Sequence, residues 1–492
     1  MVQLEQDNVV HREHVHKHPQ IASAFSEIER ALAKISPSSC FYDRNSLLET
    51  LKPDFERIFQ FYFNQGILLV DALSKLDAHA ELEHIQVPVT SFTKYINRVV
   101  THINKAVATF EENIQRINDT LCLALSTSRQ AILSISLLGF ETHNGGKQPL
   151  KFELSHGQSI VFKYTPLYSE DLFSTIIEHC WQSEHKPNTL QVVCIDENCG
   201  FSKYIETNTT FASAVEIPKF YVNTGELLAI AYALNISDMH MENIIKQAHL
   251  PILLDLESLF YQFPKKMGKP TVFATQMLQP KAIDFYSSGI QGGGKTKHYF
   301  PTINKRKSDL YGNMNFRNEG YHTANRIFNH QEMINPSLYQ DEIIAGFSQG
   351  YLNLKPNRQK VIEIIQNYEH LNKLRIRHIL RHTVYYVNHL FHLNKPFIDI
   401  ATNQLSRLNL DESDAAPLSE PIIAMEKSQL LEGDVPYFYT KMNDRHLYAE
   451  NRIIVENYFN NDSFHEVKSK LDQLSQDDMR YQIDLIRKSL NG

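Results

Sequence analysis

The stretch SDMHMENIIKQAHLPILLDLESL (237–259) joins a cluster of polar residues to an apolar run, and the prediction of the fold starts from it. Before it, GELLAIAYALNI (225–236) has the apolar spacing of a helix. SDMHMEN (237–243) is typical of a polar turn, and LPILLDLESL (250–259) of a buried strand. This order of helix, polar loop and strand places the loop where functional residues often lie.

The spacing of the polar residues suggests a chemistry. Asp238, His240 and Asn243 lie within six residues, and Asp255 follows twelve residues after Asn243. In a protein-kinase catalytic loop, an Asp accepts the hydroxyl proton, an Asn five positions later binds magnesium, and the next strand carries a metal-binding Asp. Here the loop reads DxHxxN instead of HRDxxxxN, and DLE (255–257) replaces DFG, which disfavours an ordinary protein kinase. The alternative interpretation is a solvated loop before a core strand.

A small antiparallel sheet is predicted before this loop. PLKFEL (149–154) and SIVFKY (159–164) alternate apolar and polar residues around a His-Gly turn, and QVVCI (191–195) adds a third strand. Lys163 lies on the second of these strands, in the chain order and element type of the kinase lysine that contacts phosphates. Phosphoryl transfer needs cations and a positioned base, so carboxylate, amide and ammonium groups together suit it.

The remaining chain is predicted to be mostly helical. Apolar residues recur at helical spacing from about residue 20 to 138, as in 55–73 and 95–114, and again in 341–354, 358–374 and 464–490. We therefore expect three domains: a helical N-terminal region (1–134), a small β-rich lobe (135–222) and a larger lobe (223–492).

Composition narrows the classes of function. The 492 residues include 49 Lys+Arg and 56 Asp+Glu, a net charge of −7, and the basic residues are scattered. Nucleic-acid binding needs clustered basic residues, so it is not expected. The N-terminus lacks the apolar core of a secretory signal, no apolar run is long enough for a membrane span, and the five cysteines suggest reduced thiols. These features predict a cytoplasmic protein and leave signal-independent secretion open.

Three further signals are interpreted as structural. Residues 289–296 fit the pattern GxxxxGK[ST], but no apolar strand precedes them and Pro301 follows closely, so a flexible glycine loop is expected instead of a P-loop. The histidines at 11, 14, 16 and 18 are typical of a mobile tail, and CIDENC (194–199) of a turn between strands.

Several motifs resemble those of one known family. ETHNGGKQPLKFELSHGQSIVFKY (141–164) and residues 237–260 are similar to the dehydratase domain of class II lanthipeptide synthetases, as are YQDEIIAGFSQGY (339–351), RHILRHTVYY (377–386) and LLEGDVPYF (430–438). The resemblance implies an α+β, bilobal, lipid-kinase-like fold with a helical N-terminal cap and a mostly helical C-terminal lobe. It also implies an enzyme that uses ATP and Mg2+ to phosphorylate Ser or Thr of a precursor peptide, and then eliminates phosphate to leave dehydroalanine or dehydrobutyrine.

The resemblance also implies roles for individual residues. The phosphorylation and nucleotide-metal set is Lys163, Asp238, His240, Asn243, Asp255 and Glu257, with Asn243 and Asp255 as metal ligands; the elimination set is His143, Arg377 and Thr383. Arg377 begins an intact Arg-x-x-x-Arg-x-Thr pattern, for which the alternative is an amphipathic helix with a local Arg. Glu141 stands where the family has Asp, and one added methylene can cost about a hundredfold in rate through misplacement.

The sequence leaves two questions open: where a cyclase would come from, and whether the protein is a dehydratase. There is no Cys after Cys199, so the family's zinc cyclase domain is not expected in this chain, and a separate cyclase would be a partner. The alternatives to a dehydratase are a phosphotransferase that stops at phosphate, acting on a protein target, and a pseudoenzyme that binds nucleotide or peptide without turnover.

Overall fold

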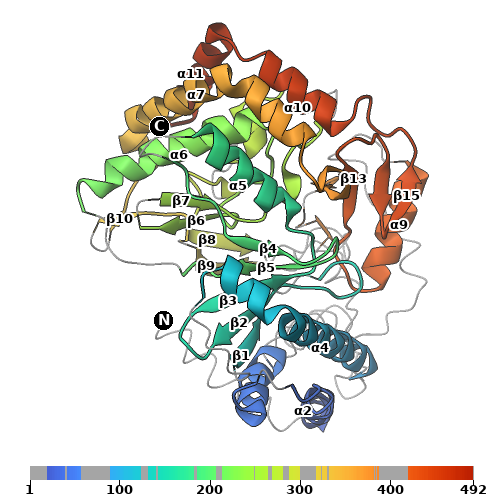
Figure 1. Cartoon of the computed structure of the whole chain (residues 1–492). Coiled ribbons are helices and arrows are strands. Elements are labelled where there is room, and N and C mark those ends of the chain that lie inside the picture. Colours follow the sequence, from blue (N-terminus) through green and yellow to red (C-terminus); the bar gives the residue numbers. More distant parts are fainter. Residues whose placement is uncertain are drawn as a thin grey trace, which may run out of the picture. The chain divides into compact units, whose positions relative to one another are not determined.

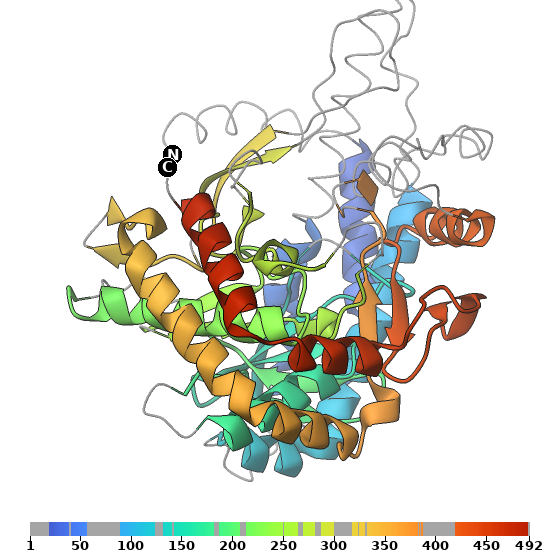
Figure 2. The same cartoon turned by 90° about the horizontal axis from the view of Figure 1, so that it is seen from above.

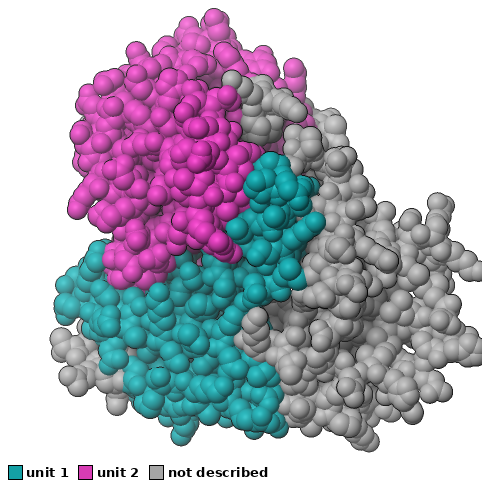
Figure 3. Space-filling view, turned by 90° about the vertical axis from the view of Figure 1, so that its right-hand side faces the viewer, with its two compact units in different colours: residues 1–164, 379–437 teal, residues 165–378, 438–492 magenta. Residues whose placement is uncertain are grey.

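In the computed structural model the chain forms two compact units, each of which is described by itself (Figure 3). Unit 1 comprises residues 1–164 and 379–437, and unit 2 comprises 165–378 and 438–492. The structure describes all residues except 1–18, 39–40, 57–88, 124–130, 140–141, 182–185, 207–212, 249, 264–268, 281–286, 300–316, 323, 330–331, 382, 384, 387–418 and 491–492. The predicted domains were continuous segments, whereas unit 1 takes in a second segment from late in the chain.

Unit 1 contains the predicted N-terminal helices. Its helices are α2 (Pro19–Leu32), a helix over residues 44–56, α4 (Val89–Thr120) and α9 (Glu420–Leu431). The helix predicted at 95–114 is confirmed within α4, where Ile96, Val99, Ile103 and Phe110 form a buried stripe at helical spacing. Most of the helix predicted at 55–73 falls outside the described residues.

The β-strands of unit 1 confirm the predicted hairpin. Strands β1 (Ile132–Leu137), β2 (Leu150–Leu154) and β3 (Ser159–Lys163) pair antiparallel in that order (Figure 1). Leu150, Phe152 and Leu154 alternate with less buried residues on β2, as expected of a half-buried strand. The helical pattern predicted to run to residue 138 is wrong at β1, because pairing with β2 makes an extended strand of that apolar run.

Unit 2 is built around two long helices. They are α6 (Glu216–Ala233) and α7 (Gln340–Gln366), which lie side by side in both Figure 1 and Figure 2. A Cβ added at Gly225 would lie 2.0 Å from the Ile343 carbonyl oxygen, and one at Gly346 would lie 1.8 Å from the Val222 carbonyl oxygen. The two glycines therefore allow the helix backbones to touch, and α7 continues through Pro356 where two separate segments were predicted.

The other helices of unit 2 pack around this pair. They are α5 (Tyr168–Cys180), α10 (Ser463–Asp472) and α11 (Gln476–Leu490), with 3-10 turns η2 (Leu256–Ser258), η4 (Val272–Thr275), η6 (Pro336–Tyr339) and η7 (Leu371–Lys373). α10 and α11 confirm the predicted C-terminal helices. The core of the unit buries apolar residues of all five helices.

Unit 2 also holds more strand than the sequence predicted. Its strands are β4 (Val192–Cys194), β5 (Gly200–Lys203), β6 (Ile244–Gln247), β7 (Leu250–Leu253), β8 (Gly294–Tyr299), β9 (Arg317–His322), β10 (Phe328–Asn329), β11 (Glu332–Met333), β12 (Arg375–His378), β13 (Phe438–Lys441), β14 (Leu447–Ala449) and β15 (Arg452–Val455). β12 to β15 form a four-stranded sheet, so the prediction of a mostly helical second half is incomplete. These strands are too short to show a clear period of two.

The described chain is thus a mixture of helices and small antiparallel sheets, which agrees with the predicted α+β class. Among the described residues, no helix combines the length and apolar character that crossing a bilayer requires.

Candidate functional site

Two buried methionines fix the course of the loop 237–243, which follows α6 in unit 2. The N–H of Met239 donates to the Thr275 carbonyl oxygen, and the N–H of Met241 donates to the Ser287 carbonyl oxygen, each at 3.0 Å. Both methionine side chains are buried. The loop is therefore a tightly held segment with alternating buried and partly exposed residues.

The predicted polar residues alternate with these methionines and lie close to one another. Asp238 and His240 are both partly exposed, and Asp238 Oδ1 lies 3.8 Å from His240 Nε2. The Asn243 amide Nδ2 donates to the Asp238 carbonyl oxygen at 2.8 Å and lies 3.4 Å from His240 Nε2. Asp238 takes a left-handed backbone with a φ of 62°, which turns the chain at this point. The structure thus brings these three residues together.

The β6–β7 hairpin brings Asp255 to the same place. Ile244 pairs with Leu253 in the register of the hairpin. One position further, the Leu254 N–H donates to the Asn243 carbonyl oxygen at 2.8 Å, and Asp255 follows directly. Asn243 and Asp255, which are twelve residues apart in the sequence, therefore lie at neighbouring positions at the open end of one hairpin. The strand β6 was not predicted, and it is the element that creates this proximity.

Asn243 and Asp255 offer the donor types that suit magnesium. Carboxylate and amide oxygens are hard ligands, and Mg2+ is commonly held by one or two such groups together with phosphate oxygens and water. The described residues contain no group of three or more His, Cys, Asp or Glu side chains placed to hold a metal ion. The two side chains fit a shared metal–phosphate site better than a closed protein cage.

Glu257 and Arg377 form an ion pair within unit 2 that links the predicted phosphorylation and nucleotide-metal set to the predicted elimination set. Arg377 Nη1 lies 3.6 Å from Glu257 Oε2, and each side chain is only 15% exposed. Glu257 lies on η2, against which β12 packs. The alternative of an amphipathic helix does not hold at Arg377, because the residue lies on β12, where it pairs with Tyr439 of β13. Backbone pairing with a strand far along the chain overrides the local helical pattern.

The second arginine of the pattern has a structural partner in unit 1. Arg381 Nε lies 3.0 Å from Glu426 Oε1, and the Tyr386 hydroxyl donates to the same oxygen at 2.6 Å. Burial raises the pKa of Glu426, and the charged arginine beside it favours the ionised form. This buried cluster holds the segment that includes Thr383, which is helical and partly exposed.

Lys163 is the last residue of β3 and is partly exposed. Because it belongs to unit 1, the structure does not test its predicted place beside the loop of unit 2.

Glu170 on α5 was missed at the sequence level. It is buried, and its Oε1 accepts a hydrogen bond from the Leu256 N–H at 3.3 Å, directly after Asp255. The sequence signal that could have pointed to it is an acidic residue in the first turn of the helix that follows the lysine strand.

His143 lies in a tight turn of unit 1. His143 and Lys147 exchange two backbone hydrogen bonds of 3.0 and 2.9 Å. His143 Nδ1 lies 2.9 Å from the Val435 carbonyl oxygen, and its ring contacts Tyr437 edge-on. Glu141 lies outside the described residues, so its effect stays a prediction.

The glycine segment 289–296 does not have the geometry of a P-loop. Lys295 lies on β8, where a P-loop would begin a helix. A Cβ added at Gly289 would lie 2.4 Å from the Met239 carbonyl oxygen, and the Asn325 amide donates to the Gly289 carbonyl oxygen at 2.9 Å. The segment begins as a turn packed against the loop 237–243 at Gly289 and continues into β8.

The other signals are resolved in part. Residues 194–199 form a turn between β4 and β5, as predicted, and neither Cys194 nor Cys199 forms a disulfide within the described part of the chain. The N-terminal histidines fall outside the described residues.

Comparison with known proteins places the chain in a family. The model of a domain of unknown function, DUF4135, matches residues 90–441, so the chain belongs to that family. The lacticin 481/lactococcin biosynthesis protein LcnDR2 of Lactococcus lactis subsp. lactis is 25% identical over 387 residues. That match covers 72% of this chain and 40% of the relative, so the chain spans well under half of the relative's length.

Proposed function

We propose that this protein is an ATP- and magnesium-dependent dehydratase of the lanthipeptide synthetase type. It would phosphorylate Ser or Thr in a precursor peptide and then eliminate the phosphate, leaving dehydroalanine or dehydrobutyrine. The proposal draws on the match to a protein named for lacticin 481 biosynthesis and on the family membership.

The observation that carries the phosphorylation half is the hairpin that sets Asn243 beside Asp255, with Asp238 tied to Asn243 by a hydrogen bond. We assign Asp238 as the group that accepts the hydroxyl proton, with His240 beside it. Asn243 and Asp255 would hold the metal, and Lys163 and Glu257 would help bind the nucleotide. Bound Mg-ATP would supply the phosphoryl group and offset its charge.

The elimination half needs a base and a cation. We assign proton transfer to His143 and the holding of the leaving phosphate to Arg377, whose planar group donates two parallel hydrogen bonds to phosphate. Thr383 and Glu141 are assigned to the same step through their positions in the motif. Glu257, which pairs with Arg377, keeps that side chain oriented near the nucleotide-binding residues.

Mass spectrometry of a modified peptide tests the proposal. The full chain is incubated with ATP, Mg2+ and the lacticin 481 precursor peptide, with a reaction lacking Mg2+ as the control. We expect a phosphorylated intermediate followed by a product with a net loss of water. Phosphate gain without later water loss would favour the kinase-only alternative, and ATP binding without any change to the peptide would favour a pseudoenzyme.

A further inference from the structure

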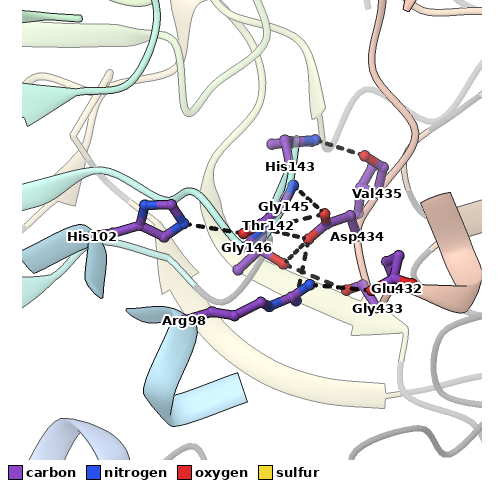
Figure 4. A network of polar contacts seen from close by, with 10 residues as sticks. All are labelled: Arg98, His102, Thr142, His143, Gly145, Gly146, Glu432, Gly433, Asp434 and Val435. Carbon is purple, nitrogen blue, oxygen red and sulfur yellow. Dashed lines mark hydrogen bonds and ion pairs between the residues drawn. The ribbon is translucent and has the colours of Figure 1, made fainter. Parts of the chain in front are cut away.

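The turn that carries His143 is folded around one buried carboxylate, that of Asp434 (Figure 4). The Gly145 N–H donates to Asp434 Oδ2 at 2.6 Å, and the Gly146 N–H donates to Oδ1 at 3.0 Å. The Thr142 hydroxyl donates to Oδ1 at 2.7 Å. Three donors from one short turn therefore converge on a residue nearly three hundred positions later in the chain.

The backbone of the turn is shaped for an anion. Asn144, Gly145 and Gly146 all have positive φ angles, of 47°, 90° and 88°. Successive N–H groups in a turn can point to one side and form a concave anion site, and here the N–H groups of Gly145 and Gly146 hold the side chain of Asp434. Arg98 of α4 lies 3.7 Å from the same carboxylate and adds a positive charge. The turn and Asp434 are thus complementary in shape and charge.

The residue after Asp434 sets the orientation of the histidine ring. The Val435 N–H donates to the Thr142 carbonyl oxygen at 2.8 Å, and the Val435 carbonyl oxygen lies 2.9 Å from His143 Nδ1. A carbonyl oxygen only accepts, so Nδ1 must carry the hydrogen. In the neutral ring, Nε2 is then the unprotonated nitrogen, which is the basic one.

We propose that Asp434 is a positioning residue for His143: it fixes the turn so that the Val435 carbonyl oxygen holds His143 as the Nδ1–H tautomer, which makes Nε2 the base. The inference rests on the proposed function. In the elimination, Nε2 takes the α proton of the phosphorylated residue, and the C–H electron pair becomes the Cα=Cβ double bond. The Cβ–O bond breaks with its electron pair on the leaving phosphate.

Nitrogen-15 NMR of the histidine-labelled full chain tests the tautomer without any substrate. We expect wild-type His143 signals of the Nδ1–H form, assigned by their loss in His143→Gln. Asp434→Asn should shift them toward a mixture of tautomers, because an amide offers one acceptor oxygen and turns its NH2 toward N–H donors. Unchanged His143 signals in Asp434→Asn would overturn the inference.

Two further variants serve as control and safeguard. Glu432→Gln removes a charge that lies 3.8 Å from the same Arg98, on a side chain that is 56% exposed. Because it leaves the Asp434 carboxylate in place, it should leave the signals unchanged. Thr142→Val removes one hydrogen bond to Asp434 and should shift the signals slightly in the direction of Asp434→Asn. It decides the question if Asp434→Asn fails to fold: no shift in Thr142→Val would then overturn the inference.

Kinetics separate this inference from the proposed function. With a synthetic peptide carrying one phosphoserine, Asp434→Asn should lower kcat for phosphate release by about a hundredfold with little change in KM, since misplacement of a catalytic group by about an ångström has that effect. Its phosphorylation rate on the unmodified peptide should match wild type. Equal losses in both steps would mark Asp434 as merely structural. If wild type releases no phosphate, the proposed function fails, and the NMR comparison still decides the inference.

Discussion

The loop 237–257 and the turn 142–147 carry the two halves of the proposed chemistry, and they are held in different ways. In the loop, one hairpin register places Asn243 beside Asp255, so residues twelve positions apart fix the geometry. In the turn, His143 is oriented by Asp434 and Val435, which lie nearly three hundred positions later. The proximity of Asn243 and Asp255 is therefore set by a local hairpin, whereas the orientation of His143 depends on contacts between residues distant in the chain.

This difference explains how much of the site could be predicted. The spacing of Asp238, Asn243 and Asp255 was readable from its likeness to a kinase catalytic loop, although the strand β6 that brings Asn243 beside Asp255 was not predicted. The role of Asp434 could not be predicted, because no local sequence pattern indicates that a carboxylate accepts hydrogen bonds from the backbone N–H groups of a distant turn. The position of Lys163 relative to the loop stays a prediction.

In the fold too, elements defined by local sequence patterns were predicted, and elements defined by long-range pairing were missed. Helices with a continuous apolar stripe, such as α4 and α11, and the β2–β3 hairpin were predicted from spacing and alternation. Strands β1 and β12 were missed, because each is defined by pairing with a strand elsewhere in the chain. Arg377 accordingly lies on a strand, and the alternative of an amphipathic helix does not hold there.

Arg377→Ala should separate the phosphorylation step from the elimination step most strongly. Loss of the phosphate-holding cation should lower elimination by about 10²- to 10³-fold, so that phosphorylated peptide accumulates while its formation continues. The time course of intermediate and product by mass spectrometry measures both steps. Arg375→Ala is the matched control, since Arg375 lies on the same strand and instead packs over the Tyr439 ring at 5.2 Å. Equal loss of both steps in Arg377→Ala would refute its assigned role.

Gly146→Ala should damage the turn alone. The residue has a φ of 88°, and an added Cβ would lie 2.9 Å from Arg98 Nε, so we expect a loss of about 1–3 kcal/mol in the free energy of unfolding. Gly157→Ala is the control, because its φ is 85° but nothing lies within 4 Å of the added Cβ. Denaturant unfolding compares them, and elimination should fall only in Gly146→Ala. Equal behaviour of the two variants would show that Arg98 does not restrict the turn.

His378, beside Arg377, should give the smallest effect. Burial lowers its pKa from 6.5 to about 3, and its ring packs against those of Tyr261 and Phe459. Between about pH 6.5 and 3, His378 is therefore protonated in the unfolded chain but neutral in the folded chain. The free energy of unfolding falls as the pH falls through this window. We expect a contribution of about 1 kcal/mol between pH 6.5 and 5.5. His378→Phe should remove that part of the slope in urea titrations, and an unchanged slope would contradict the assignment.

Nucleotide binding measured by calorimetry tests the central claim most directly. Titration of a non-hydrolysable ATP analogue into the full chain should show affinity that depends on Mg2+ and that falls at least about tenfold in Asp255→Asn, because one metal ligand is lost. The same affinity with and without Mg2+, or in wild type and Asp255→Asn, would contradict the assignment of Asp255 and Asn243 to a metal–nucleotide site.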